Sequence, residues 1–407
     1  MQCGLLGQTL SHSYSPQIHS RLGNYNYRLF EIAPEALKDF LCSDSFQGIN
    51  VTIPYKKSVI PYCSALSDRA KVVGAVNTIV RQQDGSLVGH NTDYYGFSAM
   101  LKRSGLKVDG RKVLVLGSGG ASATVVAVLT KLGADPIVIS RSGENNYNNL
   151  HKHLDTTIIV NATPVGMYPN TGKSPVDLRQ FPNLEGVLDL IYNPARTALL
   201  QQAEEMGLVT ENGLWMLVAQ AKEAAEWFTG TTIADSVIGD IHKELRLQME
   251  NIVLVGMPGC GKSTIGKDLA EKLGKTFVDA DEEIVKVAGI SIPEIFAAHG
   301  EAGFREIETQ VLARLGKQSG LVIATGGGCV TIPANYNHLH QNSTIFWLQR
   351  DINKLPTEGR PLSQTSKLAD MYAIRKPLYE QFADIAICNE NSVESAVNRI
   401  IDSLSGG

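Results

Sequence analysis

Several features that mark specialised protein classes are scarce or missing in this sequence. Its 407 residues include only six cysteines and no Cys-x-x-Cys pair, so neither a zinc site nor a disulfide framework is expected, and a reducing cytoplasm is favoured. No run of about 20 apolar residues could span a membrane, and the first residues lack the basic and apolar segments of a secretory signal. The net charge of -4 does not indicate the basic surface that is typical of nucleic-acid-binding proteins.

The length and pattern of the chain predict several α/β domains. At roughly 100–200 residues per domain, 407 residues suggest two or three. Strand-like apolar runs alternate with helical patterns, which is typical of α/β folds with mostly parallel sheets. In residues 112–133 and again in residues 251–274, an apolar strand ends in glycines and a helix follows. Since helix N-termini attract anions, each segment predicts a phosphate-binding site, and the pair predicts two nucleotide-binding domains in tandem.

The boundary between the two halves is expected in a helical region. Residues 214–229 read as an amphipathic helix, and a helical pattern continues to Glu250, just before a new strand at Ile252. We place the junction at residues 243–250. No Gly/Ser-rich or Pro-rich spacer occurs there, so the halves are expected to be closely joined.

The first glycine-rich turn indicates a dinucleotide. It comprises Gly117, Ser118, Gly119, Gly120 and Ala121. Gly117 permits the tight turn, and Gly119 lets the backbone approach a pyrophosphate. The next strand ends at Ser140 and Arg141, where an arginine suits the 2′-phosphate of NADP; a solvated loop arginine is the alternative.

Polar motifs precede this turn and suit a small polyhydroxylated substrate. The segments HSYSP, NVTIPYK, GAVNT and GHNTDYYG supply hydroxyl, amide, amine and carboxylate groups: Ser13, Ser15, Asn50, Thr52, Lys56, Asn77 and Asp93. Asn50 and Thr52 are expected on one face of a strand. Lys56 and Asp93 could act as an acid–base pair. Each motif alone could equally be a turn or a cap.

Together these motifs, with GSGGA and MLVAQA, resemble shikimate dehydrogenase over residues 1 to about 245. The resemblance implies that Ser13 and Ser15 hold the substrate carboxylate, and that Lys56 beside Asp93 transfers the proton. The residues implied to line the ring hydroxyls are Asn50, Thr52, Asn77, Asp93, Tyr192 and Gln220. It further implies that residues 117–121 hold the pyrophosphate, that Ser140 and Arg141 face the adenosine phosphate, and that Leu190 and Gly213 approach the nicotinamide. Tyr14 and Asn145 depart from the family, which often has basic residues there.

The second glycine-rich turn fits the P-loop pattern G-x-x-x-x-G-K-[ST] at residues 256–263. Its backbone amides are expected to cradle the phosphates of ATP, with Lys262 at the β/γ oxygens and Ser263 on Mg²⁺. Cys260 is expected to pack rather than react. The ATP-binding residues predicted from this loop are Gly259, Cys260, Gly261, Lys262, Ser263 and Thr264.

Motifs that follow the P-loop suggest the phosphoryl acceptor. Asp279 and Asp281 are expected on one face at the end of the second strand of this half, where they suit Mg²⁺ and a hydroxyl. Arginines from separate elements suit a carboxylate, because the guanidinium fork matches it. The further residues are Arg305, Gly326, Gly327, Gly328, Arg360 and Arg375.

These motifs resemble shikimate kinase across residues 251 to about 405. The resemblance implies that Asp279 supports Mg²⁺ and that Asp281 binds the acceptor hydroxyls. It implies that Arg305 and Arg375 grip the carboxylate, with Gly326, Gly327 and Gly328 against the ring, and that Arg360 meets the transferring phosphoryl group from a lid. The stretch between Arg360 and Arg375 is a few residues shorter than in the family.

The sequence therefore predicts a cytoplasmic, bifunctional enzyme. The expected fold is an α/β substrate domain (residues 1–92, with return helices at 214–242), a Rossmann NADP-binding domain (93–213) and a P-loop domain (251–407). Expected cofactors are NADP(H), ATP and Mg²⁺; expected partners are small molecules, neither nucleic acid nor membrane, and the oligomeric state stays open. Three alternatives remain: an NAD-dependent quinate/shikimate dehydrogenase, a kinase for another small hydroxy acid, and one inactive, regulatory half.

Overall fold

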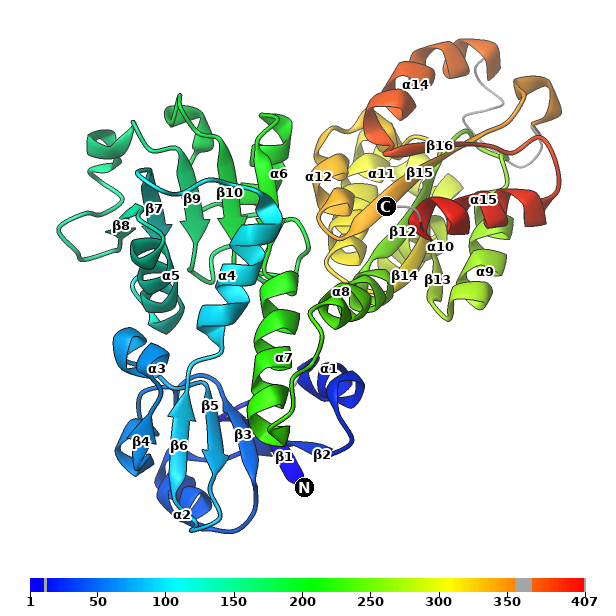
Figure 1. The fold of residues 1–407 in the computed structure, drawn as a ribbon. Coiled ribbons are helices and arrows are strands. Elements are labelled where there is room, and N and C mark those ends of the chain that lie inside the picture. The colour runs from blue at the N-terminus through cyan, green and yellow to red at the C-terminus, as the bar shows by residue number, and fades with distance from the viewer. Residues whose placement is uncertain (11–12, 356–367, 406–407) are drawn as a thin grey trace. The chain divides into compact units, whose positions relative to one another are not determined.

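The computed structural model describes residues 1–10, 13–355 and 368–405, and these contain three β-sheets with helices packed on them (Figure 1). The chain divides into two compact units. The first comprises residues 1–166, 173–192 and 199–244; the second comprises residues 167–172, 193–198 and 245–407. The limits of the three domains expected from the sequence remain a prediction. No helix in the described ranges is long and apolar enough to cross a lipid bilayer.

The first sheet of the first unit is mixed rather than parallel. Its strands are β1 (Gln2–Gly7), β2 (Asn26–Glu31), β3 (Gly48–Val51), β4 (Ala65–Leu66), β5 (Thr78–Arg81) and β6 (Leu87–His90), in the order β2-β1-β3-β5-β6-β4. Strand β5 is antiparallel to β3 and to β6. The pairing with β6 follows from a short turn, with Gly85 at φ 83°, that joins the two strands directly. Its helices are α1 (Ser15–Leu22), α2 (Leu37–Cys42) and α3 (Asp68–Val73).

The second sheet of this unit is parallel and starts with the predicted strand–glycine–helix segment. Its strands are β7 (Lys112–Leu116), β8 (Asp135–Ile139), β9 (Ile158–Asn161), β10 (Gly186–Asp189) and β11 (Val209–Asn212), in the order β11-β10-β9-β7-β8. Helix α5 (Gly120–Lys131) follows β7, and α6 (Ala198–Glu205) precedes β11. The predicted strand and helix in residues 112–133 are therefore confirmed.

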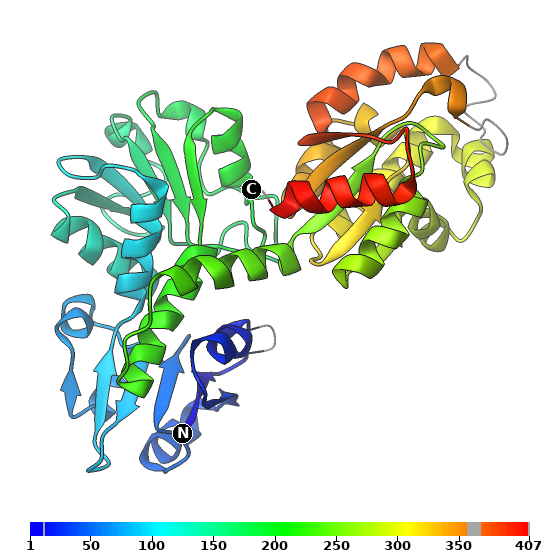
Figure 2. The ribbon, with the colours of Figure 1, turned by 45° about the vertical axis from the view of Figure 1, so that its right-hand side comes forward.

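Two helices connect the two sheets of the first unit. They are α4 (Asp93–Ser104) and α7 (Leu214–Thr229), which pack against each other (Figure 2). A Cβ on Gly96 would lie 2.7 Å from the Met216 carbonyl oxygen, so only glycine allows this approach. Helix α7 has the predicted bounds and returns to the first sheet, where Phe228 lies against Gly48. Helix α8 (Ser236–Met249) follows.

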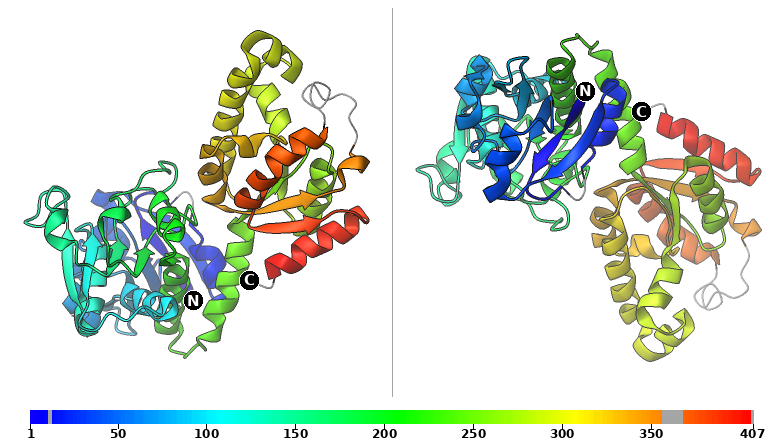
Figure 3. Two further views of the ribbon diagram at one scale, coloured as in Figure 1. Left: turned by 90° about the horizontal axis from the view of Figure 1, so that it is seen from above. Right: turned by 90° about the horizontal axis from the view of Figure 1, so that it is seen from below.

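The third sheet is parallel throughout. Its strands are β12 (Asn251–Val255), β13 (Thr276–Asp279), β14 (Leu321–Ala324), β15 (Ser343–Gln349) and β16 (Ile385–Cys388), in the order β13-β14-β12-β15-β16. Its helices are α9 (Lys262–Leu273), α10 (Ala280–Ala288), α11 (Ile292–Gly316), α12 (Ala334–His340), α14 (Leu368–Phe382) and α15 (Val393–Ser405). Helices α9 and α15 pack together on one face of the sheet, and α11 and α12 cover the other (Figure 3).

The described residues also contain short 3₁₀ helices. They span Pro34–Ala36, Ile60–Tyr62, Leu150–His153, Leu178–Gln180, Cys329–Thr331 and Ile352–Lys354. All six cysteines are free thiols, and Cys3, Cys260 and Cys329 are buried.

Candidate active sites

An ion pair lies at the start of α4. The Nζ atom of Lys56 donates to the Oδ2 atom of Asp93 over 2.6 Å, and the two side chains are 24% and 13% exposed. Asp93 is the first residue of α4, where the helix dipole favours a negative charge. The carboxylate thus holds an accessible ammonium group in place, and such a group can donate a proton to an oxygen in hydrogen-bond range.

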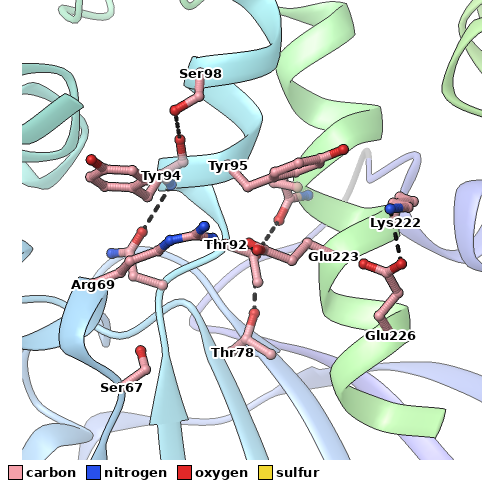
Figure 4. A network of polar contacts seen from close by, with 12 residues as sticks. Ser67, Arg69, Thr78, Thr92, Tyr94, Tyr95, Ser98, Lys222, Glu223 and Glu226 are labelled. Atoms are coloured by element: carbon pink, nitrogen blue, oxygen red, sulfur yellow. Dashed lines mark hydrogen bonds and ion pairs between the residues drawn. The ribbon is translucent and has the colours of Figure 1, made fainter. Parts of the chain in front are cut away.

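Amide side chains gather close to this pair. Asn77 Nδ2 donates to Thr92 Oγ1 (3.0 Å), and the backbone N–H of Thr92 donates to Asn77 Oδ1 (2.7 Å). The Thr92 hydroxyl also donates to Gln220 Oε1 on α7, over 3.4 Å. Asn50 Nδ2 donates to Thr78 Oγ1 (3.1 Å), and Figure 4 shows Thr78 directed at Thr92. The predicted ring-binding residues Asn50, Asn77 and Gln220 therefore belong to one hydrogen-bonded network.

Thr52 and the two serines lie at the ends of elements. Strand β3 ends at Val51, and Thr52 follows it directly, with its N–H donating to the Leu6 carbonyl of β1 over 2.9 Å. Ser15 is buried at the start of α1, and its backbone N–H donates to Ser13 Oγ over 3.2 Å. The first motif also contains His12, which lies outside the described residues.

Tyr14 takes the position where the family often has a basic residue, and it contacts another predicted site residue. Its ring lies edge-on to that of Tyr192, with 6.3 Å between the centroids. Burial raises the pKa of Tyr192, and the neighbouring Tyr14 adds to this rise. Tyr192 is therefore a neutral phenol at physiological pH and can donate a hydrogen bond.

The first glycine-rich turn fits a pyrophosphate. Gly117 has φ 106°, and a Cβ there would lie 3.0 Å from Thr163 Cγ2, so the turn needs glycine. A Cβ on Gly119 or Gly120 would meet no atom within 4 Å, which leaves room for a ligand. No side chain caps the start of α5, so its first N–H groups can bind phosphate oxygens.

The remaining predicted cofactor residues lie on loops that follow strands β8, β10 and β11 of the second sheet. A Cβ on Gly213 would lie 2.0 Å from the Leu190 carbonyl oxygen, so the two predicted nicotinamide residues are adjacent. Ser140 follows β8, and its N–H donates to the Asn145 carbonyl over 3.1 Å. Arg141 is exposed beside this turn and could meet a phosphate.

The P-loop contains glycines in the left-handed region and holds its lysine against its own backbone. Gly256, Gly259 and Gly261 all have positive φ, at 146°, 84° and 99°. The buried Nζ of Lys262 donates to the carbonyls of Gly256 (2.9 Å) and Met257 (3.1 Å). These contacts hold the lysine side chain against the loop, and the backbone amides of the loop can bind phosphate.

Asn389, which lies outside the P-loop, holds the backbone of the loop in place. Asn389 Nδ2 donates to the carbonyl of Cys260 over 2.6 Å, and Cys260 is fully buried, as expected for a packing residue. Ser263 and Thr264 are exposed at the start of α9.

Ser263 and Asp279 are arranged as the predicted metal pair. Ser263 Oγ donates to Asp279 Oδ2 over 2.7 Å. Among the residues that the structure describes, no group of three or more His, Cys, Asp or Glu side chains could hold a metal ion. A Mg²⁺ ion bound by this pair would therefore take its other ligands from phosphate oxygens and water, as is usual for this ion.

The predicted acceptor residues meet around the triple glycine. A Cβ on Gly328 would lie 2.1 Å from Arg305 Nη2, and one on Gly326 would lie 3.1 Å from Asp281 Oδ1. Arg375 Nη1 donates to the Gly327 carbonyl over 3.2 Å. Two buried arginines and one carboxylate thus lie around three glycines, where any side chain would push them apart.

The position of Asp281 differs from the prediction. Strand β13 ends at Asp279, and Asp281 lies in the first turn of α10, where its N–H donates to Asp279 Oδ1 over 3.0 Å. The helix starts earlier than expected because Asp279 caps it. Burial and the nearby Asp279 raise the pKa of Asp281, while Lys262 and Arg305 act in the opposite direction. A carboxylate with a raised pKa is suited to take a proton from a hydroxyl.

Glu308 is a residue of this site that sequence reasoning missed. It is fully buried, and its Oε2 accepts from Arg305 Nη1 over 2.7 Å. Its Oε1 has no hydrogen-bond partner among the described residues and lies 2.7 Å from where a Gly326 Cβ would be. The spacing of three residues on a helix could have indicated the pair. Arg360, the predicted lid residue, lies outside the described residues.

Comparison with known proteins finds a family match in each of the two parts of the chain. The model of the shikimate dehydrogenase substrate binding domain matches residues 5–79, and the shikimate kinase model matches residues 258–405. A shikimate dehydrogenase (NADP(+)) of Clostridium perfringens is 36% identical over 265 residues, which cover 60% of this chain and 97% of that protein. The chain belongs to the shikimate dehydrogenase family.

Solved structures agree over the same part of the chain. Shikimate dehydrogenase 1 from Peptoclostridium difficile is 40% identical, with a TM-score of 0.56 over 60% of this chain and 98% of that one. A chorismate mutase/shikimate 5-dehydrogenase fusion from Clostridium acetobutylicum is 36% identical, with a TM-score of 0.57 over 60% and 96%. With its shikimate kinase domain, this shikimate dehydrogenase is a bifunctional enzyme of the shikimate pathway.

Proposed function

We propose that the chain catalyses two consecutive reactions. The dehydrogenase reduces 3-dehydroshikimate to shikimate with NADPH, and the kinase transfers a phosphoryl group from Mg-ATP to shikimate, giving shikimate 3-phosphate. The observation that carries the first step is the Lys56–Asp93 pair within a network of amide side chains. The second step rests on the P-loop beside Asp281, Arg305 and Arg375.

In the first reaction, Lys56 is proposed to supply the proton. NADPH, when bound, supplies the hydride. As the carbonyl carbon gains hydride, its oxygen becomes negative, and the Lys56 ammonium donates a proton to it while Asp93 holds the amine in place. Ser13 and Ser15 would bind the carboxylate, and Asn50, Asn77 and Gln220 would bind the ring hydroxyls.

In the second reaction, the chain positions the reactants and neutralises charge. Arg305 and Arg375 would bind the carboxylate of shikimate, and Asp281 would accept the proton of the attacking hydroxyl. Lys262 would move from the Gly256 and Met257 carbonyls to the β/γ oxygens of ATP. Ser263 and Asp279 would hold Mg²⁺.

The cofactor of the first reaction is proposed to be NADP(H). Arg141 is exposed where the 2′-phosphate would lie, and the Clostridium perfringens relative is named as an NADP(+) enzyme. A quinate dehydrogenase from Corynebacterium glutamicum in complex with NAD is also similar, at 26% identity and a TM-score of 0.55. NAD-dependent quinate oxidation is therefore the second candidate, and a comparison of the four substrate–cofactor pairs decides between them.

A single reaction mixture tests the proposal. It contains the full chain, 3-dehydroshikimate, NADPH, ATP and Mg²⁺, and NADPH loss and ADP formation are followed together. We expect ADP to appear only after NADPH falls, and only when 3-dehydroshikimate is present. Loss of NADPH without ADP would contradict the kinase substrate, and no change in either would contradict both assignments.

A further inference from the structure

A cluster of aromatic side chains contacts Asn50 through Tyr27 and has no role in the mechanism above. It contains His19 on α1, Tyr25 before β2, Tyr27 on β2 and Phe228 on α7. His19 is 1% exposed, and its ring stacks on that of Tyr27 with 4.0 Å between centroids and 11° between planes. Its Nδ1 atom lies 2.6 Å from the Tyr25 hydroxyl.

The Tyr27 hydroxyl contacts a residue that is proposed to bind the substrate. It donates to Asn50 Oδ1 over 2.8 Å. One phenol oxygen from β2 therefore holds a side chain that is assigned to a ring hydroxyl.

His19 supports the Tyr27 ring on which it stacks. Burial lowers the pKa of His19 to about 3, so the ring is neutral, with one donor and one acceptor nitrogen. Its contacts with the Tyr27 ring and the Tyr25 hydroxyl therefore involve no buried charge.

The Asn50 amide is fixed in one orientation by its two partners. Its oxygen accepts from Tyr27, and its nitrogen donates to Thr78 over 3.1 Å. The Thr78 hydroxyl donates its own proton to Asn77 Oδ1 over 3.2 Å, so turning the amide over would place the Asn50 oxygen against an oxygen that has no proton left to donate. Asn50 is 5% exposed, so water does not replace the lost bond.

We propose that Tyr27 is a positioning residue of the dehydrogenase site, which orients the Asn50 amide for the substrate and takes no part in hydride or proton transfer. The proposal rests on the proposed function of this site. It implies that loss of the Tyr27 hydroxyl weakens binding of 3-dehydroshikimate while the chemical step is largely preserved, because Lys56 and Asp93 are untouched.

The test compares Tyr27→Phe with a matched control in the full chain. Tyr27→Phe keeps the ring that stacks on His19 and removes one oxygen; we expect the KM for 3-dehydroshikimate to rise about tenfold. The value of kcat should change by less than about threefold, and the KM for NADPH should not change. Tyr55→Phe is the control, since Tyr55 donates its hydroxyl to the Ile32 carbonyl in the apolar core and has no bond to Asn50 or Ser15. It is expected to leave the KM for 3-dehydroshikimate unchanged.

A double-variant cycle separates positioning from a merely structural effect. Asn50→Ala is expected to raise the KM for 3-dehydroshikimate, and adding Tyr27→Phe to it should raise the KM by less than about twofold more. If the two effects multiply, or if Tyr27→Phe alone leaves the KM unchanged, Tyr27 does not act through Asn50 and the proposal falls. If Asn50→Ala itself leaves the KM unchanged, the proposed substrate site is wrong. Should Tyr27→Phe not fold, Thr78→Val removes the other hydrogen bond that orients the Asn50 amide, and an unchanged KM for 3-dehydroshikimate there would overturn the proposal.

Discussion

Replacing Glu223 by glutamine is expected to remove a pH dependence from the stability of the first unit. Glu223 lies on α7, its side chain is 14% exposed, and its Oε1 accepts from Arg69 on α3 (Figure 4). Its Oε2 is buried without a hydrogen-bond partner among the described residues. Burial raises the pKa of Glu223 from 4.5 to about 7, although Arg69 acts against this rise, because Arg69 is 47% exposed and its charge is shared with water.

The direction and size of the effect follow from this shift. Between pH 4.5 and 7 the folded chain keeps a proton on Glu223 that the unfolded chain has released. The free energy of unfolding is therefore highest below the unfolded pKa and falls as the pH rises towards the folded one. The full shift corresponds to about 3 kcal/mol. Since glutamine does not ionise, Glu223→Gln should lose this decline and be more stable than the parent above pH 7.

Tryptophan fluorescence can follow the first unit alone. In a Trp347→Phe background the two remaining tryptophans, Trp215 and Trp227, both lie on α7. Urea unfolding would be measured from about pH 5 to about pH 8. The control is Glu226→Gln, one turn along the same helix, which removes an ion pair with Lys222 and should keep the decline. An identical pH slope in Glu223→Gln and in the control would refute the reasoning.

Three further predictions concern the two reactions. Lys56→Ala should lower kcat for reduction about 10²–10⁴-fold with little change in the KM for 3-dehydroshikimate; an effect confined to KM in steady-state assays would show that Lys56 only binds. Lys262→Ala should abolish ADP formation and leave NADPH oxidation intact, and parallel loss of both in a folded variant would contradict independent sites. Arg141→Ala should raise the KM for NADPH about tenfold and leave that for NADH unchanged; equal changes for both cofactors would argue against contact with the 2′-phosphate.

Sequence reasoning found the phosphate-binding turns because their glycines are required by local geometry. The positive φ values of Gly117, Gly259 and Gly261 are set within a few neighbouring residues, so the spacing of glycines in the sequence indicates them. The antiparallel pairing of β5 was not predicted, since pairing direction depends on which strands meet across the sheet. The same holds for the start of α10, which is set by the Asp279 cap.

Contacts between distant residues explain most of what the sequence did not reveal. Tyr27 meets Asn50 from a different strand, and a tyrosine does not mark a substrate site by itself. Its importance follows only from the hydrogen bond that the fold brings together. Glu308, by contrast, faces Arg305 within one helix, and the spacing of these two residues was a usable signal.

The return of α7 to the first sheet has a consequence for synthesis. Phe228 and Ala224 pack on Cys3, and Phe228 covers Gly48, so the first sheet lacks part of its cover until the ribosome has passed residue 228. At about 5–20 residues per second, on the order of ten seconds separate the emergence of β6 from that of Phe228. The nascent chain therefore carries an exposed apolar surface for that time, and it is a candidate for chaperone binding.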